Sequence, residues 1–500
     1  MPRQPWFQNA VIYQVDTSLF YDANGDGCGD LVGIRQKLYY LRSFGVTVLW
    51  LTPFYLTPFL DDGYDVQDHL QPDPRFGQIR DVIQLIDDAR ELGIRVIIEL
   101  VIQHTSSQHP WFLEARKNRH YMFYRHEPDL NLVHSPVIDE IDNILRFWLR
   151  VGVSGFRLDA ASHLVKQAGN GDEEQGYWIL AHLRQLVEQT NPEAILLGEV
   201  DVAVNDYRHY FGHSDRLQLV LNFWLNKFFY VSLARQSVKP LVSALQAMIK
   251  PPPGCCFANW LRNHDELDLE GIEDADRQFV LRCFAPEKSM SVYQRGIRRL
   301  LAPMLEGNIR RLALCHAVLL SLPGVPVIRY GDEIGMGEDL SLKERYAVRT
   351  PMQWSAGVNG GFSTAAAEKL LVRPVASGPW RYQQVNVELA LRQRHSLLQR
   401  VRQMVQLRAE YHEPGTTPFE LVSGLPPSVL ALRYRSQSRD LLMLANFSER
   451  PVEVRLPRQE TGYWSCVLED RRYRDSLTGG KVCRLQLADY GYRWFSRQHD

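Results

Sequence analysis

The sequence predicts an α/β protein, a (β/α)8 TIM barrel followed by a C-terminal antiparallel β-sandwich domain. Eight short apolar runs alternate with segments of helical periodicity along most of the 500 residues. This alternation is typical of βα units around a parallel sheet. Val, Ile and Leu dominate several of the runs, as strands buried on both faces require. After about residue 412 the pattern changes to short strands separated by turn residues.

The predicted barrel strands come first in this argument because they position everything else. They are residues 10–15, 46–51, 95–101, 155–158, 194–199, 217–223, 256–261 and 325–330. Helices are expected at 31–44 and 78–92, each followed by a glycine that suits the residue after a helix. A long helical pattern at 388–411 would close the barrel. Eight βα units are the number that a TIM barrel needs.

Two domains are therefore predicted, a catalytic barrel over residues 1–411 and a β domain over residues 412–500. The second domain has four expected strands, at 430–434, 441–445, 452–456 and 482–487. Within the first domain, a helix-like stretch at 110–119 follows the third strand.

The composition excludes several classes of partner. Lys and Arg (57) nearly balance Asp and Glu (58), so we expect no nucleic-acid partner and no anionic membrane surface. The first residues lack an apolar signal segment, and no apolar run approaches the roughly 18–20 residues that cross a bilayer. The seven cysteines show no metal-ligand spacing. We expect reduced thiols and a cytoplasmic protein.

Polar side chains follow the predicted strands at the rim where barrel enzymes place their chemistry. They are His104 after the third strand, Arg157 and Asp159 at the fourth, Glu199 at the fifth, and His264 and Asp265 after the seventh. The loop after the second strand adds the segment DDGYD at 61–65. Any one of these residues could cap a helix or form a salt bridge, but chance would not gather so many at strand ends.

Glycoside cleavage fits this set of residues. One carboxylate attacks the anomeric carbon and a second carboxyl protonates the leaving oxygen, at a separation of roughly 5–5.5 Å in retaining enzymes. Asp159 and Glu199 end consecutive strands and are our candidates for nucleophile and general acid/base. Arg157 leaves the same strand face as Asp159 and would keep it ionised. Glu199 follows an apolar strand, where an acid catalyst gains a raised pKa.

Four segments carry a resemblance to a known family. GFRLDA (155–160), GEV (198–200), RNHDE (262–266) and DDGYD (61–65) resemble the α-amylase family of glycoside hydrolases, family 13. The resemblance implies that Asp159 is the nucleophile, Glu199 the acid/base and Asp265 a third, transition-state-stabilising carboxylate. It also implies sugar-binding roles: Tyr64 would stack on the glucose, its hydroxyls would be bound by His104, Arg157 and His264, and Asp65 would pair with Arg349 to clamp its non-reducing end.

Further segments narrow the resemblance within this family. ANGDGCGDLVGI (23–34), YGDEIGMG (330–337) and VRTPMQW (348–354) are similar to the trehalose synthase and oligo-1,6-glucosidase branch. WFQNAVIYQ (6–14) and EPDLNL (127–132) look closest to trehalose synthases, which are maltose α-glucosyltransferases. The implied substrates are small α-glucosides such as maltose, trehalose or short maltooligosaccharides. No cofactor is expected for catalysis.

The loop at 22–30 predicts a structural ion. Its oxygen ligands recur at positions 1, 3, 5 and 9 with a glycine at position 6, which is the spacing of an EF-hand loop. Gly33 at position 12 replaces the bidentate Glu and excludes a complete EF-hand. We expect Ca2+ (or Mg2+) remote from the chemistry, held by Asp22, Asn24, Asp26, Asp30 and the carbonyl of Cys28. The alternative is an Asx/Gly-rich turn without metal.

The chain departs from the family pattern after the third strand. The family usually places a protruding domain B between His104 and Asp159, and here the region 105–135 is too short to hold most of it. The site should be more open, unless a loop or another copy in a homo-oligomer covers it. Gln103 and Glu99 stand where relatives have Asn and Asp, so a second calcium site is not predicted. Residues 343–348 also differ from the usual sequence of trehalose synthases. They flank the substrate-binding Arg349, so the resemblance does not extend to the preferred sugar acceptor.

Three functions remain open on the sequence. The first is trehalose synthase-like transfer or isomerisation through a covalent glucosyl-Asp159 intermediate. The second is hydrolysis of short α-glucans, which an open site favours because isomerisation must hold the released glucose and exclude water. The third is a non-catalytic amylase-like binding subunit, which the retention of all three acids disfavours.

Overall fold

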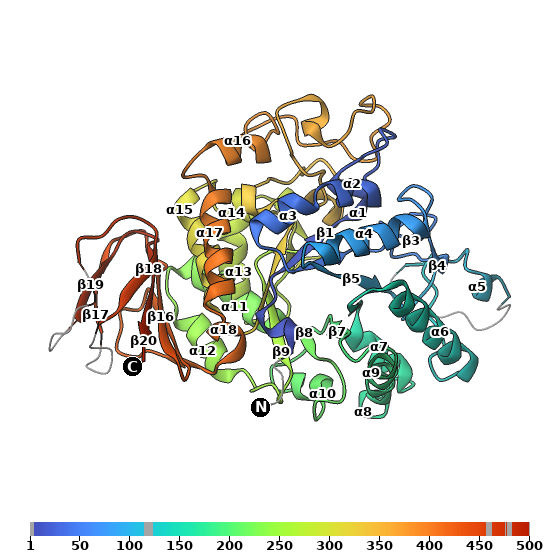
Figure 1. Cartoon of the computed structure of the whole chain (residues 1–500), viewed down its shortest axis with the longest axis horizontal. Helices are drawn as coiled ribbons and strands as arrows, with labels where there is room; N and C mark the ends of the chain where they lie inside the picture. The colour runs from blue at the N-terminus through green and yellow to red at the C-terminus, as the bar shows by residue number, and fades with distance from the viewer. Residues whose placement is uncertain (1–4, 115–123, 457–462, 476, 478–482, 500) are drawn as a thin grey trace.

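The computed structural model describes residues 5–114, 124–456, 463–475, 477 and 483–499. Its centre is a closed parallel barrel with the strand order β1-β13-β9-β8-β7-β6-β5-β2 (Figure 1). All eight predicted strands are confirmed as barrel strands. They are β1 (Ile12–Val15), β2 (Val48–Leu51), β5 (Arg95–Leu100), β6 (Gly155–Leu158), β7 (Ile195–Gly198), β8 (Leu219–Leu221), β9 (Cys256–Trp260) and β13 (Val325–Arg329).

Strand register brings the polar residues of neighbouring strands together. Glu99 of β5 lies opposite Arg157 of β6, and Leu158 lies opposite Gly198 of β7. The backbone N–H of Glu199 donates to the Leu158 carbonyl at 3.0 Å, so β6 and β7 remain paired up to the residues that follow them. Asp159 and Glu199 therefore leave the barrel at the same end, side by side.

The helices cover the outside of the barrel. The longer ones are α4 (Ile79–Glu91), α6 (Ser135–Val151), α9 (Trp178–Thr190), α11 (Phe223–Arg235), α13 (Asp274–Phe284), α15 (Ile309–Ser321) and α17 (Leu397–Glu410). Two predicted helices are split. The expected helix 31–44 forms α2 (Leu31–Gln36) and α3 (Leu38–Phe44), because Lys37 leaves the helical region. The expected helix 388–411 forms α16 (Val387–Arg392) and α17, which restarts where the Ser396 side chain caps Gln399.

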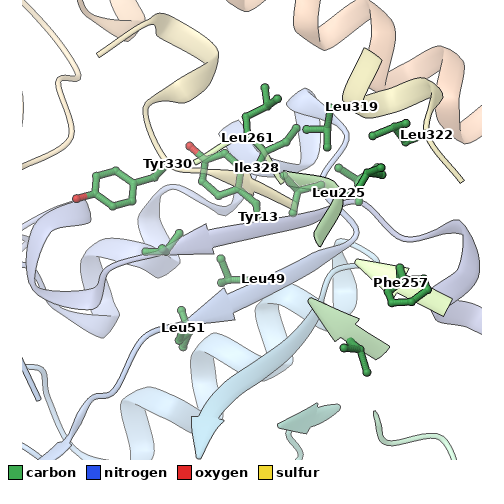
Figure 2. Close-up of a cluster of buried hydrophobic side chains, with 14 of the residues drawn as sticks. Tyr13, Leu49, Leu51, Leu225, Phe257, Leu261, Leu319, Leu322, Ile328 and Tyr330 are labelled. Carbon is green, nitrogen blue, oxygen red and sulfur yellow. The ribbon is translucent and has the colours of Figure 1, made fainter. Parts of the chain in front are cut away.

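The apolar core follows the alternation of the strands. In β2, Val48 and Trp50 face the barrel interior, while Leu49 and Leu51 face the helices. Figure 2 shows part of the outer layer, where strand residues such as Leu49 and Ile328 belong to one buried cluster with the side chains of α11 and α15. Both layers of side chains are buried, so the strands that carry the polar residues at their ends are tightly packed on both faces.

The chain crosses from the third to the fourth strand by a short route. α5 (Pro110–Glu114) follows β5, and the described chain resumes at residue 124, so the predicted helix 110–119 lies partly outside the described residues. Residues 126–130 then return along the end of β5. Ser107 N–H donates to the His126 carbonyl at 2.8 Å and Leu130 N–H donates to the Gln103 carbonyl at 2.9 Å. The returning segment is thereby fixed next to the catalytic end of the barrel.

The C-terminal domain consists of two antiparallel sheets beside the barrel, drawn in red in Figure 1. The larger sheet has the order β14-β15-β16-β20-β18, with β14 (Phe419–Leu421), β15 (Val429–Arg435), β16 (Arg439–Asn446), β20 (Tyr492–Gln498) and β18 (Ser465–Glu469). The smaller sheet pairs β17 (Val452–Leu456) with β19 (Cys483–Leu487), and one apolar cluster joins the two sheets. The predicted fold class is confirmed. Among the helices that the structure describes, none has the length and apolar composition needed to cross a membrane.

Candidate active site

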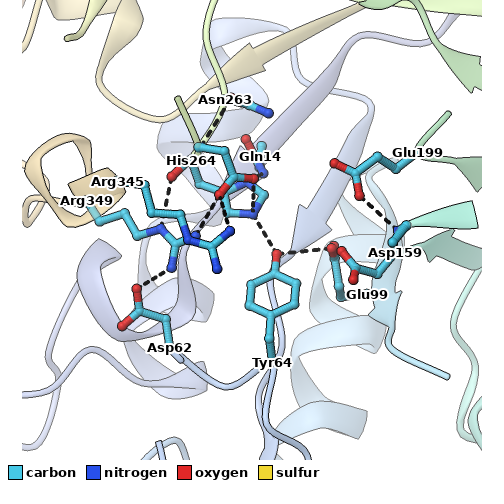
Figure 3. Close-up of polar contacts among 12 residues, drawn as sticks. Gln14, Asp62, Tyr64, Glu99, Asp159, Glu199, Asn263, His264, Arg345 and Arg349 are labelled. Carbon is cyan, nitrogen blue, oxygen red and sulfur yellow. Dashed lines mark hydrogen bonds and ion pairs between the residues drawn. The ribbon is translucent and has the colours of Figure 1, made fainter. Parts of the chain in front are cut away.

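A cavity of about 640 Å³ opens at the carboxyl ends of the barrel strands. Asp159, Glu199 and Asp265 all line it, together with Tyr64 and His104. The structure therefore brings the three predicted carboxylates together over one hollow. Figure 3 shows Asp159 and Glu199 on one side of Tyr64, and His264, Arg345 and Arg349 on the other.

Arg157 connects the two carboxyl groups proposed for bond cleavage. Its side chain is buried, its Nη1 contacts an Asp159 carboxylate oxygen, and its Nη2 lies 2.9 Å from Glu199 Oε2. Nη1 also contacts Glu99, its partner across the strands. A guanidinium keeps its charge at any working pH, so Arg157 supplies a fixed positive charge between the two carboxyls.

The surroundings of Glu199 suit a proton donor. Burial raises the pKa of Glu199 to about 7, and nearby Asp159 adds to this effect while Arg157 opposes it. The Ala160 backbone N–H donates to Glu199 Oε2 at 2.9 Å and fixes the carboxyl next to the Asp159 backbone. A carboxyl with a pKa near the working pH can both give and take back a proton.

Asp265 lies beside two arginines and the Nε2 of His264, and it stays ionised. Its Oδ1 lies 2.8 Å from Arg349 Nη2 and 3.2 Å from Arg345 Nη1, and its Oδ2 lies 3.1 Å from His264 Nε2. Burial alone would raise the pKa of this carboxyl, but His264, Arg345 and Arg349 outweigh burial and lower it. Asp265 is thus a permanent negative charge facing the cavity.

His264 and Tyr64 form one rigid unit. Their rings are parallel, with an angle of 2° and a centroid distance of 5.7 Å. The Gln14 amide donates to His264 Nδ1 at 2.7 Å, which leaves the proton of the neutral ring on Nε2. That N–H points to the Tyr64 hydroxyl at 2.6 Å, and the hydroxyl donates to Glu99 at 3.1 Å. The Tyr64 ring is therefore held in one orientation beside the cavity.

The predicted pair between Asp65 and Arg349 is wrong. Arg349 contacts Asp62 through Nη1 instead, besides its bond to Asp265. The Asp65 carboxylate accepts hydrogen bonds from Leu60 N–H at 2.9 Å and Thr57 Oγ1 at 2.9 Å, and so holds its own loop. The loop turns at Asp62, which has a positive φ of 48°, and this turn points Asp62 rather than Asp65 to the arginine.

Several residues of the site were missed as functional candidates. They are Gln14, Trp50, Asp61, Asp62, Glu99, Gln103, Glu127 and Arg345. Arg345 pairs with Asp61 at 2.8 Å and so joins the loop after β2 to the Asp265 cluster. Gln103 Nε2 donates to Asp159 Oδ2. A charged residue inside an apolar strand, such as Glu99, was the one available signal in the sequence.

The predicted ion ligands of the loop 22–30 accept hydrogen bonds from the backbone of their own loop and of α2. The Asp22 carboxylate accepts from the N–H groups of Gly25 and Gly27 at 2.7 and 2.8 Å, and the Asp30 carboxylate accepts from Ala23 and Gly33 at 2.9 and 2.6 Å. In the described part of the chain, no three His, Cys, Asp or Glu side chains are grouped to hold a metal. These oxygens serve as turn and helix caps, each with lone pairs left over, and the ion at this loop stays a prediction.

Comparison with known proteins identifies the family. The alpha amylase catalytic domain family matches residues 14–121 and 119–414, and the sucrose hydrolase-like C-terminal domain family matches residues 439–496. Trehalose synthase/amylase TreS of Mycolicibacterium smegmatis is 35% identical, covering 98% of this chain and 92% of the relative. Trehalose synthase of Pimelobacter is 34% identical, covering 98% and 95%. The α-amylase of H. orenii has the same fold, with a TM-score of 0.78 at 24% identity over 98% of this chain and 99% of that one. This chain therefore belongs to the α-amylase family and is one of its glycoside hydrolases or transglycosylases.

Proposed function

We propose that the protein transfers and isomerises glucosyl units of maltose-type disaccharides through a covalent glucosyl-Asp159 intermediate. The observation that carries this proposal is the contact of one guanidinium, that of Arg157, with both Asp159 and Glu199. The positive charge of Arg157 lies against the Asp159 carboxylate, while burial raises the pKa of the neighbouring Glu199 and keeps it able to hold a proton. Two carboxyls in different protonation states are what the retaining mechanism needs.

The first step breaks the glycosidic bond. The Asp159 carboxylate attacks the anomeric carbon, and Glu199 gives its proton to the departing oxygen, so a free sugar and a glucosyl ester form. In the second step the ionised Glu199 takes a proton from an acceptor hydroxyl. The acceptor oxygen bonds to the anomeric carbon, and the Asp159 carboxylate leaves. The product keeps the α configuration because two inversions have occurred.

The remaining residues position the glucosyl unit. Tyr64 stacks on the sugar, and His104, Arg157 and His264 bind its hydroxyls. Asp265 faces the cavity as a fixed negative charge, which favours the positive charge that develops on the sugar ring. Arg349 acts indirectly, because it contacts Asp62 and Asp265 and holds the Asp265 carboxylate in place.

The choice of acceptor separates isomerisation from hydrolysis. Relatives named trehalose synthase support isomerisation, in which the acceptor is another hydroxyl of the released glucose. Hydrolysis is the second candidate, because one of these relatives is also named an amylase. The short connection between the third and fourth barrel strands also favours it, since an open site admits water. The substrates in either case are maltose, trehalose or short maltooligosaccharides. We also propose a cytoplasmic location, from the thiol pattern of the sequence, and a homo-oligomer in which a second copy covers the open side.

An NMR time course with maltose and with trehalose tests the proposal. The expected result is α-configured product at the first time points, with the isomer exceeding free glucose. Free glucose alone would favour the hydrolase, and a β-configured first product would contradict the retaining mechanism. Absence of turnover on both sugars and on aryl α-glucosides would contradict an enzymatic function.

A further inference from the structure

Glu127 is a buried carboxyl in the cavity that none of the steps above uses. It lies in the segment that returns along the end of β5, and its side chain is 1% exposed. It lines the same cavity as Asp61, Tyr64 and Asp159. Its position is fixed by the backbone, since Glu127 N–H donates to the Tyr124 carbonyl at 3.0 Å and Ser107 N–H holds the neighbouring His126 carbonyl at 2.8 Å.

One oxygen of this carboxyl lacks a hydrogen-bond partner. Glu127 Oε1 is buried and accepts or donates no hydrogen bond to any residue that the structure describes. The nearest basic groups are His104 Nε2 at 3.8 Å and His126 Nε2 at 3.9 Å, both beyond hydrogen-bond distance. A buried polar atom left in this state destabilises the folded protein, which is typical of a group kept for a ligand rather than for stability.

The chemistry of the surroundings indicates what that ligand is. Burial, with Asp61 and Asp65 nearby, raises the pKa of Glu127 to about 9, so the carboxyl carries a proton at neutral pH. A protonated carboxyl offers one donor and further acceptor capacity, which matches the donor and acceptor of a sugar hydroxyl. A cation is a poor alternative, because a protonated carboxyl offers it no negative charge.

We propose that Glu127 binds one hydroxyl of the glucosyl unit, on the side of the ring that faces His104 and Asp61, and that this contact selects substrates carrying that hydroxyl. The inference rests on the proposed function, because it assumes that a glucosyl unit occupies the cavity. Glu127 would be a specificity-determining contact supplied by the short segment that stands where the family has domain B.

Matched variants and substrates test this assignment. Glu127→Leu removes both oxygens, whereas Glu127→Gln keeps a donor, an acceptor and the shape. Glu140→Gln, on the exposed face of α6, is the control. Each is assayed with 4-nitrophenyl α-glucoside and its 2-, 3-, 4- and 6-deoxy analogues. We expect Glu127→Leu to lower kcat/KM on the full glucoside by about 10- to 100-fold, the effect of one lost hydrogen bond. On one of the deoxy analogues, Glu127→Leu and the wild type should have the same kcat/KM, because that analogue already lacks the hydroxyl that Glu127 binds.

A second readout separates binding from a structural role. Because the unpaired carboxyl destabilises the empty site, Tm of Glu127→Leu should equal or exceed that of the wild type while kcat/KM falls. Glu127→Gln should retain most of the wild-type kcat/KM, because its amide offers a donor and an acceptor as the protonated carboxyl does. Equal losses on all analogues, no loss on any, or a Tm that falls with activity would each overturn the assignment of Glu127. Failure of the wild type to cleave the full glucoside would overturn the proposed function itself, and the two failures are thereby distinguished.

Discussion

Arg157 Nη2 lies 2.9 Å from Glu199 Oε2, while Nη1 of the same guanidinium contacts Asp159. The two carboxyls on which the proposed reaction depends are thus oriented by one buried side chain. This arrangement follows from the fold, because β6 and β7 are adjacent parallel strands and Arg157 precedes Asp159 by two residues on the same strand face.

Replacing Asp159 should remove the nucleophile and its chemistry. We expect Asp159→Asn to lower kcat on 4-nitrophenyl α-glucoside by about 10⁴-fold or more, because the amide does not form the glucosyl ester. In Asp159→Gly, added azide can enter the vacated space and should give a β-glucosyl azide, identified by NMR. An α-glucosyl azide from this variant would assign the nucleophile to another residue.

Replacing Glu199 should affect substrates according to their leaving groups. Glu199→Gln should lower kcat/KM on maltose by about 10²- to 10⁴-fold, the usual contribution of a general acid. The loss on 4-nitrophenyl α-glucoside should be much smaller, because nitrophenolate departs without protonation. Rates of both substrates with the same enzyme preparation provide the measurement, and equal losses on the two would argue against the acid role.

The pH profile should show the titration of Glu199. Its pKa of about 7 belongs to the free enzyme, which kcat/KM reports. The protonated form is the active one, so kcat/KM on maltose should be high below pH 7 and fall about tenfold per unit well above it. Glu199→Gln should lose this alkaline limb. A wild-type rate that stays constant up to about pH 9 would contradict a proton donor with this pKa.

Much of the fold could be predicted because its signal is local. Strands such as β2 and β5 are short apolar runs bounded by turn residues, and their order along the chain determines a barrel. The helix breaks at Lys37 and before Ser396 were not predicted, because the apolar periodicity continues across them and only the backbone path interrupts it.

The candidate site was predictable where its residues follow strands and much less so where they lie on loops. Asp159 and Glu199 occupy strand ends, which the barrel brings together. The partner of Arg349 depends instead on how the loop 61–65 turns, and a positive φ at Asp62 decides it. Glu127 gave no signal of its own, since its place beside His104 depends on hydrogen bonds between distant backbone segments.

The corrected pairing of Arg349 predicts different effects for two neighbouring aspartates. Asp62→Asn should raise KM for maltose and change Tm little, because it weakens the orientation of Arg349. Asp65→Ala should lower stability by about 1–3 kcal/mol, since the buried Thr57 hydroxyl and the Leu60 N–H lose their acceptor. Steady-state kinetics and thermal denaturation of both variants measure this. The opposite pattern, in which Asp65→Ala raises KM and Asp62→Asn does not, would support the pair of Asp65 and Arg349 expected from the sequence.

The ion proposed for the loop 22–30 can be tested separately from its hydrogen bonds. If the loop binds Ca2+, calcium added after EDTA treatment should raise Tm by an amount that grows with the logarithm of its concentration. Asp26→Ala should remove this response while costing little stability, because Asp26 is exposed and accepts from Cys28 N–H and from the exposed Asn24 Nδ2, each at 2.9 Å. Asp22→Ala should destabilise with or without calcium, because two buried N–H groups depend on its carboxylate. A Tm that does not respond to calcium in the wild type would make the loop a metal-free turn, as its present hydrogen bonds already permit.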